Sequence, residues 1–153
     1  MPNKKKIIWD EIFIQTKRLV KQIQNSEVPF TNIIAVSRGG LIPARLIADL
    51  LNIRRIYTIG IAMYDQKHQH QALVYQTLPI VFQSENGPSL IIDDIADTGE
   101  SLKIAIKEIE QFKPVNDYKI CSLYYKPKSQ ILPHFYSTVV ENDTWIQFPW
   151  EED

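Results

Sequence analysis

Three carboxylates close together at the end of an apolar run are the feature of this sequence with the clearest chemistry. The run "LIIDDIADTGES" spans Leu90 to Ser101, with Asp93 and Asp94 adjacent and Asp97 three positions further on. The apolar residues before the acids predict a buried strand, whose successive side chains point to opposite faces. Adjacent carboxylates at the end of a strand can hold a hydrated Mg²⁺ or accept hydrogen bonds from sugar hydroxyls. The alternative is that they only solubilise a strand end or cap a turn.

The segment after the acids is suited to binding a phosphate group. The spacing of apolar residues in "SLKIAIKEIEQF" (101–112) predicts a helix. Backbone N–H groups in the first turn of a helix lack partners and carry the positive end of its dipole, so a phosphate fits there. The hydroxyls of Thr98 and Ser101 would add two donors, and Gly99 would let the backbone approach closely. Ordinary helix capping accounts for the two hydroxyls equally well.

The elements around this segment alternate between helix and strand patterns. An alternation of this kind with continuously apolar strands predicts an α/β fold: an open, mostly parallel twisted sheet flanked by helices. In such sheets ligands bind at the carboxyl ends of the strands. Helix-like spacing occurs in 10–25, 41–52 and 101–112, and strand-like runs occur in 32–36, 54–64, 73–82, 89–93 and 118–125.

The remaining segments show weaker patterns. Residues 65–71 are polar and predict a mobile loop or hairpin tip, and Pro79 predicts that the run 73–82 lies at a sheet edge. The tail 135–153 does not extend the alternation. Lys4 to Lys6 are expected to form a solvated N-terminal tail.

Composition narrows the class of protein. The 153 residues fit a single domain, and a formal charge of -1 gives no global field for nucleic acid or an anionic membrane. One cysteine excludes an intramolecular disulfide and favours a reducing, cytoplasmic location. The apolar stretch near the N-terminus ends at Asp10, far short of a membrane span.

Three familiar sites that use paired acids do not fit. A P-loop ATPase needs G-x-x-x-x-G-K-[ST], and a dinucleotide-binding loop needs G-x-G-x-x-G after the first strand; neither occurs in the sequence. A receiver domain would combine an acid pair with Thr98 and the Lys126-Pro127 pair. Its acids lie near the start of the chain, however, whereas here two strand-loop units precede them.

The run "LIIDDIADTGES" resembles the motif with which type I phosphoribosyltransferases bind 5-phosphoribosyl-1-pyrophosphate (PRPP). The resemblance implies that Asp93 and Asp94 engage the ribose hydroxyls and Mg²⁺. It implies one domain over 1–153, with a core at about 30–127 and a small hood made by the N-terminal segment and about 128–151. It also implies that the loop and helix start hold the 5′-phosphate, through Ala96, Asp97, Thr98, Gly99, Glu100 and Ser101.

A second stretch supports the resemblance. "VSRGGLIPARLIADLL" (36–51) is similar to the pyrophosphate loop of the family. There Arg38 would give a charge-assisted donor, Gly39 and Gly40 would leave the backbone unobstructed, and Ser37 would belong to the same loop. Taken alone, an Arg-Gly-Gly sequence is more often a turn, but here it follows the first core strand.

Two further stretches are similar to the xanthine-guanine branch of the family. They are "LYYKPKS" (123–129) and "DTWIQFPWE" (143–151). The resemblance implies that Lys126 donates to the 6-oxo group of a purine, that Trp145 covers its ring and that backbone near Ile146 reads its edge. Taken singly, such a lysine is usually a surface residue and such a tryptophan usually packs in a core.

Two departures from the family pattern concern the lid and the phosphate loop. The stretch that corresponds to the lid, "YDQKHQHQ" (64–71), offers Lys67, His68 and His70 but no arginine. Glu100 stands where relatives commonly have glycine, and its carboxylate is expected to face solvent because it would repel a phosphate.

The resemblance implies a Mg²⁺-dependent purine-salvage transferase. It would move the phosphoribosyl group from PRPP to N9 of guanine, xanthine or hypoxanthine and release pyrophosphate. Asp97 would share the proton at purine N7, and the chain would form a homodimer or homotetramer, as the family commonly does. The alternatives are a phosphoribosyltransferase for another base and a non-catalytic PRPP-binding regulator, for which the segment before the first core strand is too short and too neutral to be a DNA-binding module.

Overall fold

The computed structural model describes residues 3–66, 69–113 and 117–151. Its elements form one six-stranded sheet, in the order β4-β3-β2-β5-β6-β7, and one two-stranded sheet of β1 and β8. In chain order they are β1 (Asn3–Lys6), α1 (Trp9–Asn25), β2 (Asn32–Ser37), α2 (Leu41–Leu51), β3 (Ile56–Gln66), β4 (Gln69–Gln76), the 3-10 helix η1 (Ile80–Ser84), β5 (Ser89–Ala96), α3 (Glu100–Glu110), β6 (Tyr118–Tyr125), β7 (Phe135–Val139) and β8 (Thr144–Gln147).

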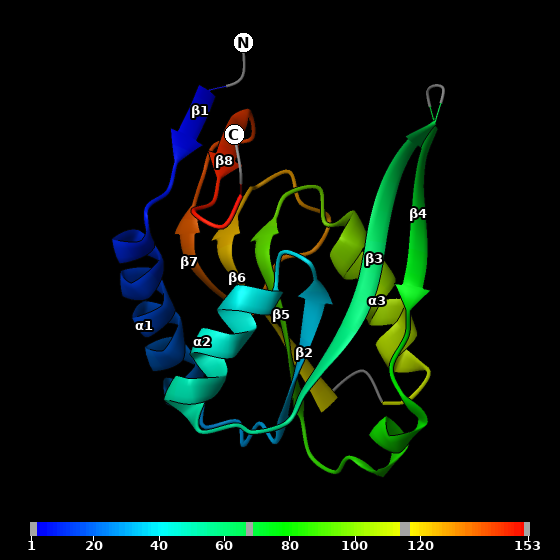
Figure 1. Cartoon of the computed structure of the whole chain (residues 1–153). Coiled ribbons are helices and arrows are strands. Elements are labelled where there is room, and N and C mark those ends of the chain that lie inside the picture. The colour runs from blue at the N-terminus through cyan, green and yellow to red at the C-terminus, as the bar shows by residue number, and fades with distance from the viewer. Residues whose placement is uncertain (1–2, 67–68, 114–116, 152–153) are drawn as a thin grey trace.

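The large sheet is parallel except at one edge. β2 pairs in parallel with β3 and β5, β5 with β6, and β6 with β7, whereas β4 runs antiparallel to β3. Figure 1 shows the parallel strands pointing toward one edge, beyond which the β3–β4 hairpin rises. The predicted α/β class is confirmed, and β4 lies at the sheet edge as Pro79 predicted.

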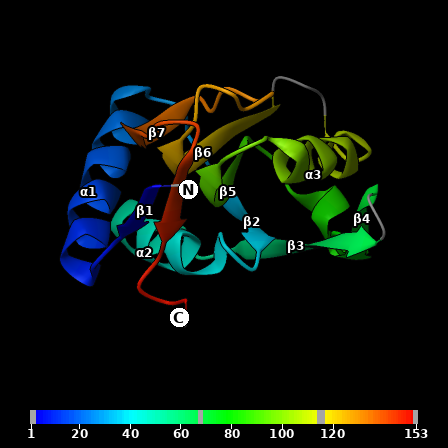
Figure 2. The same cartoon turned by 90° about the horizontal axis from the view of Figure 1, so that it is seen from above.

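Helices cover both faces of the sheet. One buried cluster joins side chains of α1 and α2 to alternate residues of the strands, such as Ile33, Leu90 and Leu123. The other joins α3 and η1 to the opposite residues, such as Ile34 and Ile91. Figure 2 shows α1 and α2 on one side of the sheet and α3 on the other. Strands buried on both faces explain why their sequences are continuously apolar.

The order in which the chain adds strands to the sheet reverses between β2 and β5. From β2 it passes through α2 to β3 on one side, and from β5 through α3 to β6 on the other. The β2–β5 ladder ends at the pair Ala35–Ile92, while the β5–β6 ladder continues to Ala96–Tyr125. The two central strands therefore part just before the acid pair, at the kind of switch point where open α/β sheets bind ligands.

Several predicted boundaries were wrong. β5 continues to Ala96 rather than ending at 93, because β6 supplies hydrogen-bond partners past the point where β2 leaves. Residues 80–82 belong to η1 and not to an extended run, because Phe82 turns inward to the core. Within 65–71, the backbone of the described residues continues β3 and β4, so a hairpin is correct and a loop is not.

Both chain ends contribute strands that the sequence patterns missed. Lys4 to Lys6 belong to β1, which pairs with β8 through backbone groups that do not depend on side-chain polarity. In the tail, β7 extends the large sheet beyond β6. The end of the tail is tied to α1 by aromatic contacts: Trp150 stacks on Phe148 and meets Trp9 at 5.9 Å between ring centroids.

The β1–β8 sheet stands at the carboxyl end of the large sheet, on the side of β6 and β7 (Figure 1). The division into a core and a hood stays a prediction. Residues 128–151, which were assigned to the hood, include β7 of the large sheet. In the described part of the chain, no helix has the length and apolar character needed to cross a membrane.

Candidate functional site

Asp93 and Asp94 lie where β5 has already lost its partner β2. Both side chains are 8% exposed, and the backbone N–H of Asp94 donates to Oδ1 of Asp93 at 2.8 Å. This short contact between neighbours fixes the Asp93 carboxylate. The strand therefore presents two nearly buried acids at the carboxyl edge of the sheet, as the sequence predicted.

The loop from β2 to α2 approaches Asp94 closely. A methyl group on Gly39 would lie 2.5 Å from Oδ2 of Asp94, so the carboxylate occupies the space that any other residue would fill. The exposed Arg38 stands next to Gly39, and the peptide bond between Ser37 and Arg38 is cis. The structure thus brings the expected pyrophosphate loop against the expected ribose-binding acids, although Gly39 and Asp93 are 54 positions apart in the sequence.

The surroundings of the acid pair favour a cation. Burial raises the pKa of Asp93 well above its ordinary value, and the charge of Asp94 raises it further. Burial also raises the pKa of Asp94, to about 6, and the carboxylate of Glu151 adds to the rise. Bound Mg²⁺ would remove this electrostatic cost, so the pair fits the ion that the family resemblance implies.

The acid pair would not hold a metal ion alone. Over residues 3–66, 69–113 and 117–151, no three His, Cys, Asp or Glu side chains gather into a group that could do so. Because Mg²⁺ prefers six oxygen ligands, the remaining positions would be filled by a ligand or by water.

The loop that follows β5 is braced by the loop that follows β6. The Lys126 N–H donates to the carbonyl of Ala96 at 2.9 Å, and the Gln130 N–H donates to the carbonyl of Thr98 at 2.8 Å. Gly99 has a φ of 85°, and a side chain there would collide with Ser129. Glycine at 99 therefore serves both the turn and the close packing.

The start of α3 offers backbone N–H groups that have no hydrogen-bond partner within the helix. The first helical hydrogen bond runs from the Lys103 N–H to the Gly99 carbonyl at 2.9 Å, so the amides before Lys103 are not bonded within the helix. The Thr98 hydroxyl accepts the Glu100 N–H at 3.3 Å, as a cap does. This geometry suits an anion, and it also includes the capping that the sequence left open.

Asp97 forms the most elaborate polar contact of the site. Its Oδ2 accepts a hydrogen bond from Lys126 Nζ at 3.1 Å, and its Oδ1 pairs with Lys128 Nζ at 3.1 Å. Lys126 is buried, whereas the side chain of Asp97 is 44% exposed. An ammonium thus lies on each carboxylate oxygen, and this pairing of ammonium and carboxylate could meet a ligand that needs a donor and an acceptor side by side.

Four predicted site residues differ in how far their side chains are buried. The side chain of Ala96 is buried in the core below α3, so only its backbone can reach a ligand. Ile146 is likewise buried, and the proposed contact there involves its backbone alone. Glu100 begins α3 and is half-buried rather than fully turned to solvent. Trp145 is 61% exposed in β8, which leaves its ring open to cover a ligand.

The side chains expected to form the lid lie outside the described part of the structure. Lys67 and His68 lie outside the described residues. His70 contributes backbone pairing with Asp65 in the β3–β4 hairpin, and its side chain also lies outside what the structure describes. The assignment of these residues to a lid stays a prediction.

Sequence reasoning missed three residues that the structure places in this region. Lys128 lies in the stretch "LYYKPKS", and its role comes from its contact with Asp97, which the motif does not reveal. Glu151 ends the stretch "DTWIQFPWE", and its charge is felt at Asp94. Ser129 packs against Gly99. The motifs contained all three, but their contacts depend on how distant loops meet.

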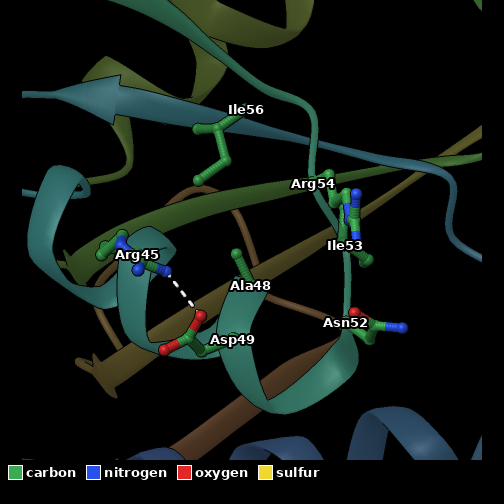
Figure 3. A pocket seen from close by; sticks show the side chains of 7 residues that line it. All are labelled: Arg45, Ala48, Asp49, Asn52, Ile53, Arg54 and Ile56. Carbon is green, nitrogen blue, oxygen red and sulfur yellow. Dashed lines mark hydrogen bonds and ion pairs between the residues drawn. The ribbon is translucent and has the colours of Figure 1, made fainter.

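A separate pocket of about 350 Å³ lies at the far end of α2 (Figure 3). Arg45 and Asp49 point toward each other there and form an exposed ion pair at 2.7 Å. Asn52 ends the helix with a φ of 55°, a conformation that asparagine tolerates. The lining residues belong to the second half of α2 and the segment that leads into β3, whereas the acid pair lies against Gly39, just before α2 begins.

The chain is similar to known phosphoribosyltransferases over nearly its whole length. Residues 8–153 match the family model described as a phosphoribosyl transferase domain. The xanthine-guanine phosphoribosyltransferase of Idiomarina loihiensis is 32% identical over 146 residues, which cover 95% of this chain and 85% of that protein. The corresponding protein of Chromohalobacter salexigens is 32% identical over 145 residues, covering 95% and 82%.

Solved structures also resemble this chain over nearly its whole length. A purine phosphoribosyltransferase from Pyrococcus horikoshii superimposes with a TM-score of 0.78 at 26% identity, covering 98% of this chain and 95% of that one. A hypothetical protein from Neisseria gonorrhoeae with bound ppGpp superimposes with a TM-score of 0.82 at 27% identity, covering 99% and 91%.

Two neighbouring glycines make a matched test of the site geometry. In Gly39→Ala the atoms nearest the new methyl all belong to the Asp94 carboxylate, so we expect the fold to survive and binding of Mg²⁺ with PRPP to weaken about tenfold or more as the carboxylate is displaced. In Gly40→Ala the methyl meets the backbone of Val36 and Ile92, so the free energy of unfolding should fall by about 1–3 kcal/mol or more. Urea unfolding and titration calorimetry measure the two effects. Equal loss of stability in both variants would contradict the close approach of Gly39 to Asp94.

Proposed function

Because the chain belongs to the phosphoribosyl transferase family, we propose that it transfers the 5-phosphoribosyl group of PRPP to N9 of a 6-oxopurine and releases pyrophosphate. The observation that supports this most directly is the contact of Asp97 with Lys126 at 3.1 Å, beside the acid pair. In a 6-oxopurine, O6 and N7 are neighbours on one edge of the ring. An ammonium and a carboxylate held together are complementary to that edge.

The other site residues each bind a different part of the substrates. Ser37, Arg38, Gly39 and Gly40 bind the diphosphate, and Asp93 and Asp94 accept hydrogen bonds from the ribose hydroxyls. The loop and first turn of α3, from Ala96 to Ser101, bind the 5′-phosphate. Trp145 covers the purine ring, backbone near Ile146 reads its edge, and Lys67, His68 and His70 serve the lid.

The transfer itself depends mainly on charge. The C1–O bond of the ribose breaks, its electron pair leaves with pyrophosphate, and the N9 lone pair forms the new C1–N9 bond. Arg38 stabilises the negative charge that collects on the leaving group. Mg²⁺, held near Asp93 and Asp94, would supply further neutralisation of that charge when bound.

Asp97 completes the proton balance. A purine that carries its proton on N7 has a free lone pair on N9, and it must lose the N7 proton once N9 has reacted. The Asp97 carboxylate accepts that proton, and Lys126 donates to O6, which orients the ring so that N7 faces Asp97. Lys128 keeps the carboxylate in place while Lys126 turns to the base.

Asp97→Asn should lower kcat by roughly ten- to a thousandfold, because an amide cannot accept the N7 proton. The measurement is pyrophosphate release from PRPP and Mg²⁺ with guanine, xanthine, hypoxanthine and adenine in turn. Wild-type turnover in this variant would remove Asp97 from the mechanism. Glu108→Gln, on the outer part of α3, is a control that should leave turnover unchanged.

The same assay separates an enzyme from a regulator. The neighbour with bound ppGpp supports the second candidate, because ppGpp carries a guanine and two diphosphate groups and is chemically suited to a site of this kind. Release of pyrophosphate with a purine identifies an enzyme. Binding of ppGpp without release for any base would identify a non-catalytic regulator.

Lys126→Ala should raise the KM for guanine and hypoxanthine about tenfold or more, because a charge-assisted hydrogen bond to O6 is lost. The KM for PRPP should change much less. Steady-state kinetics with each substrate varied in turn measures both constants. An unchanged base KM would show that Lys126 does not contact the 6-oxo group.

The remaining features of the proposal concern context. A homodimer or homotetramer is proposed because members of the family commonly form one. A cytoplasmic location is proposed from the single cysteine, which is buried in β6. A role in purine salvage follows from the substrates, since the reaction turns a free base into a nucleotide.

A further inference from the structure

Tyr75 is notable because the strand ladder is interrupted where it lies. In the β3–β4 ladder Ile61 pairs with Val74 and Gly60 pairs with Gln76. Tyr75 is therefore an extra residue of β4, with no partner of its own on β3. A β-bulge of this kind re-aims a side chain, and bulges recur beside functional sites.

The bulge turns the Tyr75 ring across Gly60 toward β2. A methyl group on Gly60 would collide with the ring, so only glycine leaves this path open. Ser37 is the register partner of Gly60 on β2, and its Oγ lies 3.1 Å from Tyr75 Oη. The phenol thus reaches across one strand to the first residue of the proposed diphosphate loop.

Packing explains the ring of Tyr75 but not its hydroxyl. An aromatic ring laid over a strand glycine is a known way to stabilise a sheet, and phenylalanine would serve as well. The ring is also 54% exposed, so burial does not demand a particular side chain. The hydroxyl has a single contact that the structure records, and that contact is with Ser37.

We propose that Tyr75 is a positioning residue for the diphosphate of PRPP and that it acts through Ser37. The inference rests on the proposed function and deepens it. The phenol is the more acidic of the two hydroxyls and donates to Ser37 Oγ, which leaves the Ser37 proton directed at a diphosphate oxygen. Hydrogen bonds in such a chain strengthen one another. The lid stretch lacks an arginine, and this relay adds a neutral donor from the same β3–β4 hairpin.

Tyr75→Phe tests the relay, because it removes the hydroxyl and keeps the ring over Gly60. Titration calorimetry with inorganic pyrophosphate and Mg²⁺, and separately with PRPP and Mg²⁺, should show binding about three- to tenfold weaker. The KM for the purine base and the urea midpoint of unfolding should not change. A structural role alone would move the unfolding midpoint and leave diphosphate binding intact.

Tyr118→Phe is the matched control. It removes a hydroxyl that donates to Glu110 at 2.8 Å, at the opposite end of the sheet, and it should leave pyrophosphate binding unchanged. Tight binding by wild type together with equally tight binding by Tyr75→Phe would overturn the inference and leave the proposed function standing. Failure of wild type to bind either diphosphate would overturn both.

A double variant tests whether Tyr75 acts through Ser37. Ser37→Ala should weaken pyrophosphate binding at least as much as Tyr75→Phe, and the two changes together should be no worse than Ser37→Ala alone. A further loss in the double variant would mean that Tyr75 acts independently of Ser37, which contradicts the relay.

Discussion

The site depends on the parting of two neighbouring strands. β2 and β5 pair as far as Ala35 and Ile92, and then the chain turns into α2 on one side while β5 runs on toward α3. The gap is filled by the Asp94 carboxylate lying against Gly39. Because both helices begin at this point, the β2–α2 loop, the start of α3 and the acid pair lie together at the carboxyl edge of the sheet. A sugar that carries a phosphate at one end and a diphosphate at the other needs both loops and the acid pair to bind it.

The same arrangement is costly for the folded protein. Asp93 and Asp94 are nearly buried, and their raised pKa values mean that the folded state disfavours their charged forms. Acids of this kind contribute stability only where they are protonated, and that contribution is lost as the pH rises through the folded-state pKa. At neutral pH the pair therefore opposes folding, and a bound cation with its ligand would offset the cost. Substrate and cation are thus expected to stabilise the protein as well as react in it.

The sequence predicted those features of the fold and the site that a local pattern of residues determines. The order of the central strands and helices and the edge position near Pro79 followed from periodicity, and the gathering of Asp93, Asp94 and Gly39 at one sheet edge followed from the family resemblance. It did not predict β1, β7 or β8, because short strands with exposed or mixed side chains carry little periodic signal. The contacts of Lys128 with Asp97 and of Tyr75 with Ser37 were also missed, since each depends on a loop or bulge that no spacing rule encodes.

The acid pair is proposed to hold the ribose of PRPP where the strands part. The direct measurement is calorimetric titration of PRPP with Mg²⁺ into the wild type and into a variant with both Asp93→Asn and Asp94→Asn. These substitutions keep the shape of the side chains and remove their charge, so binding should be about tenfold weaker or more, with an unchanged or raised unfolding midpoint. Equal affinity in the two proteins would contradict this role of the acid pair.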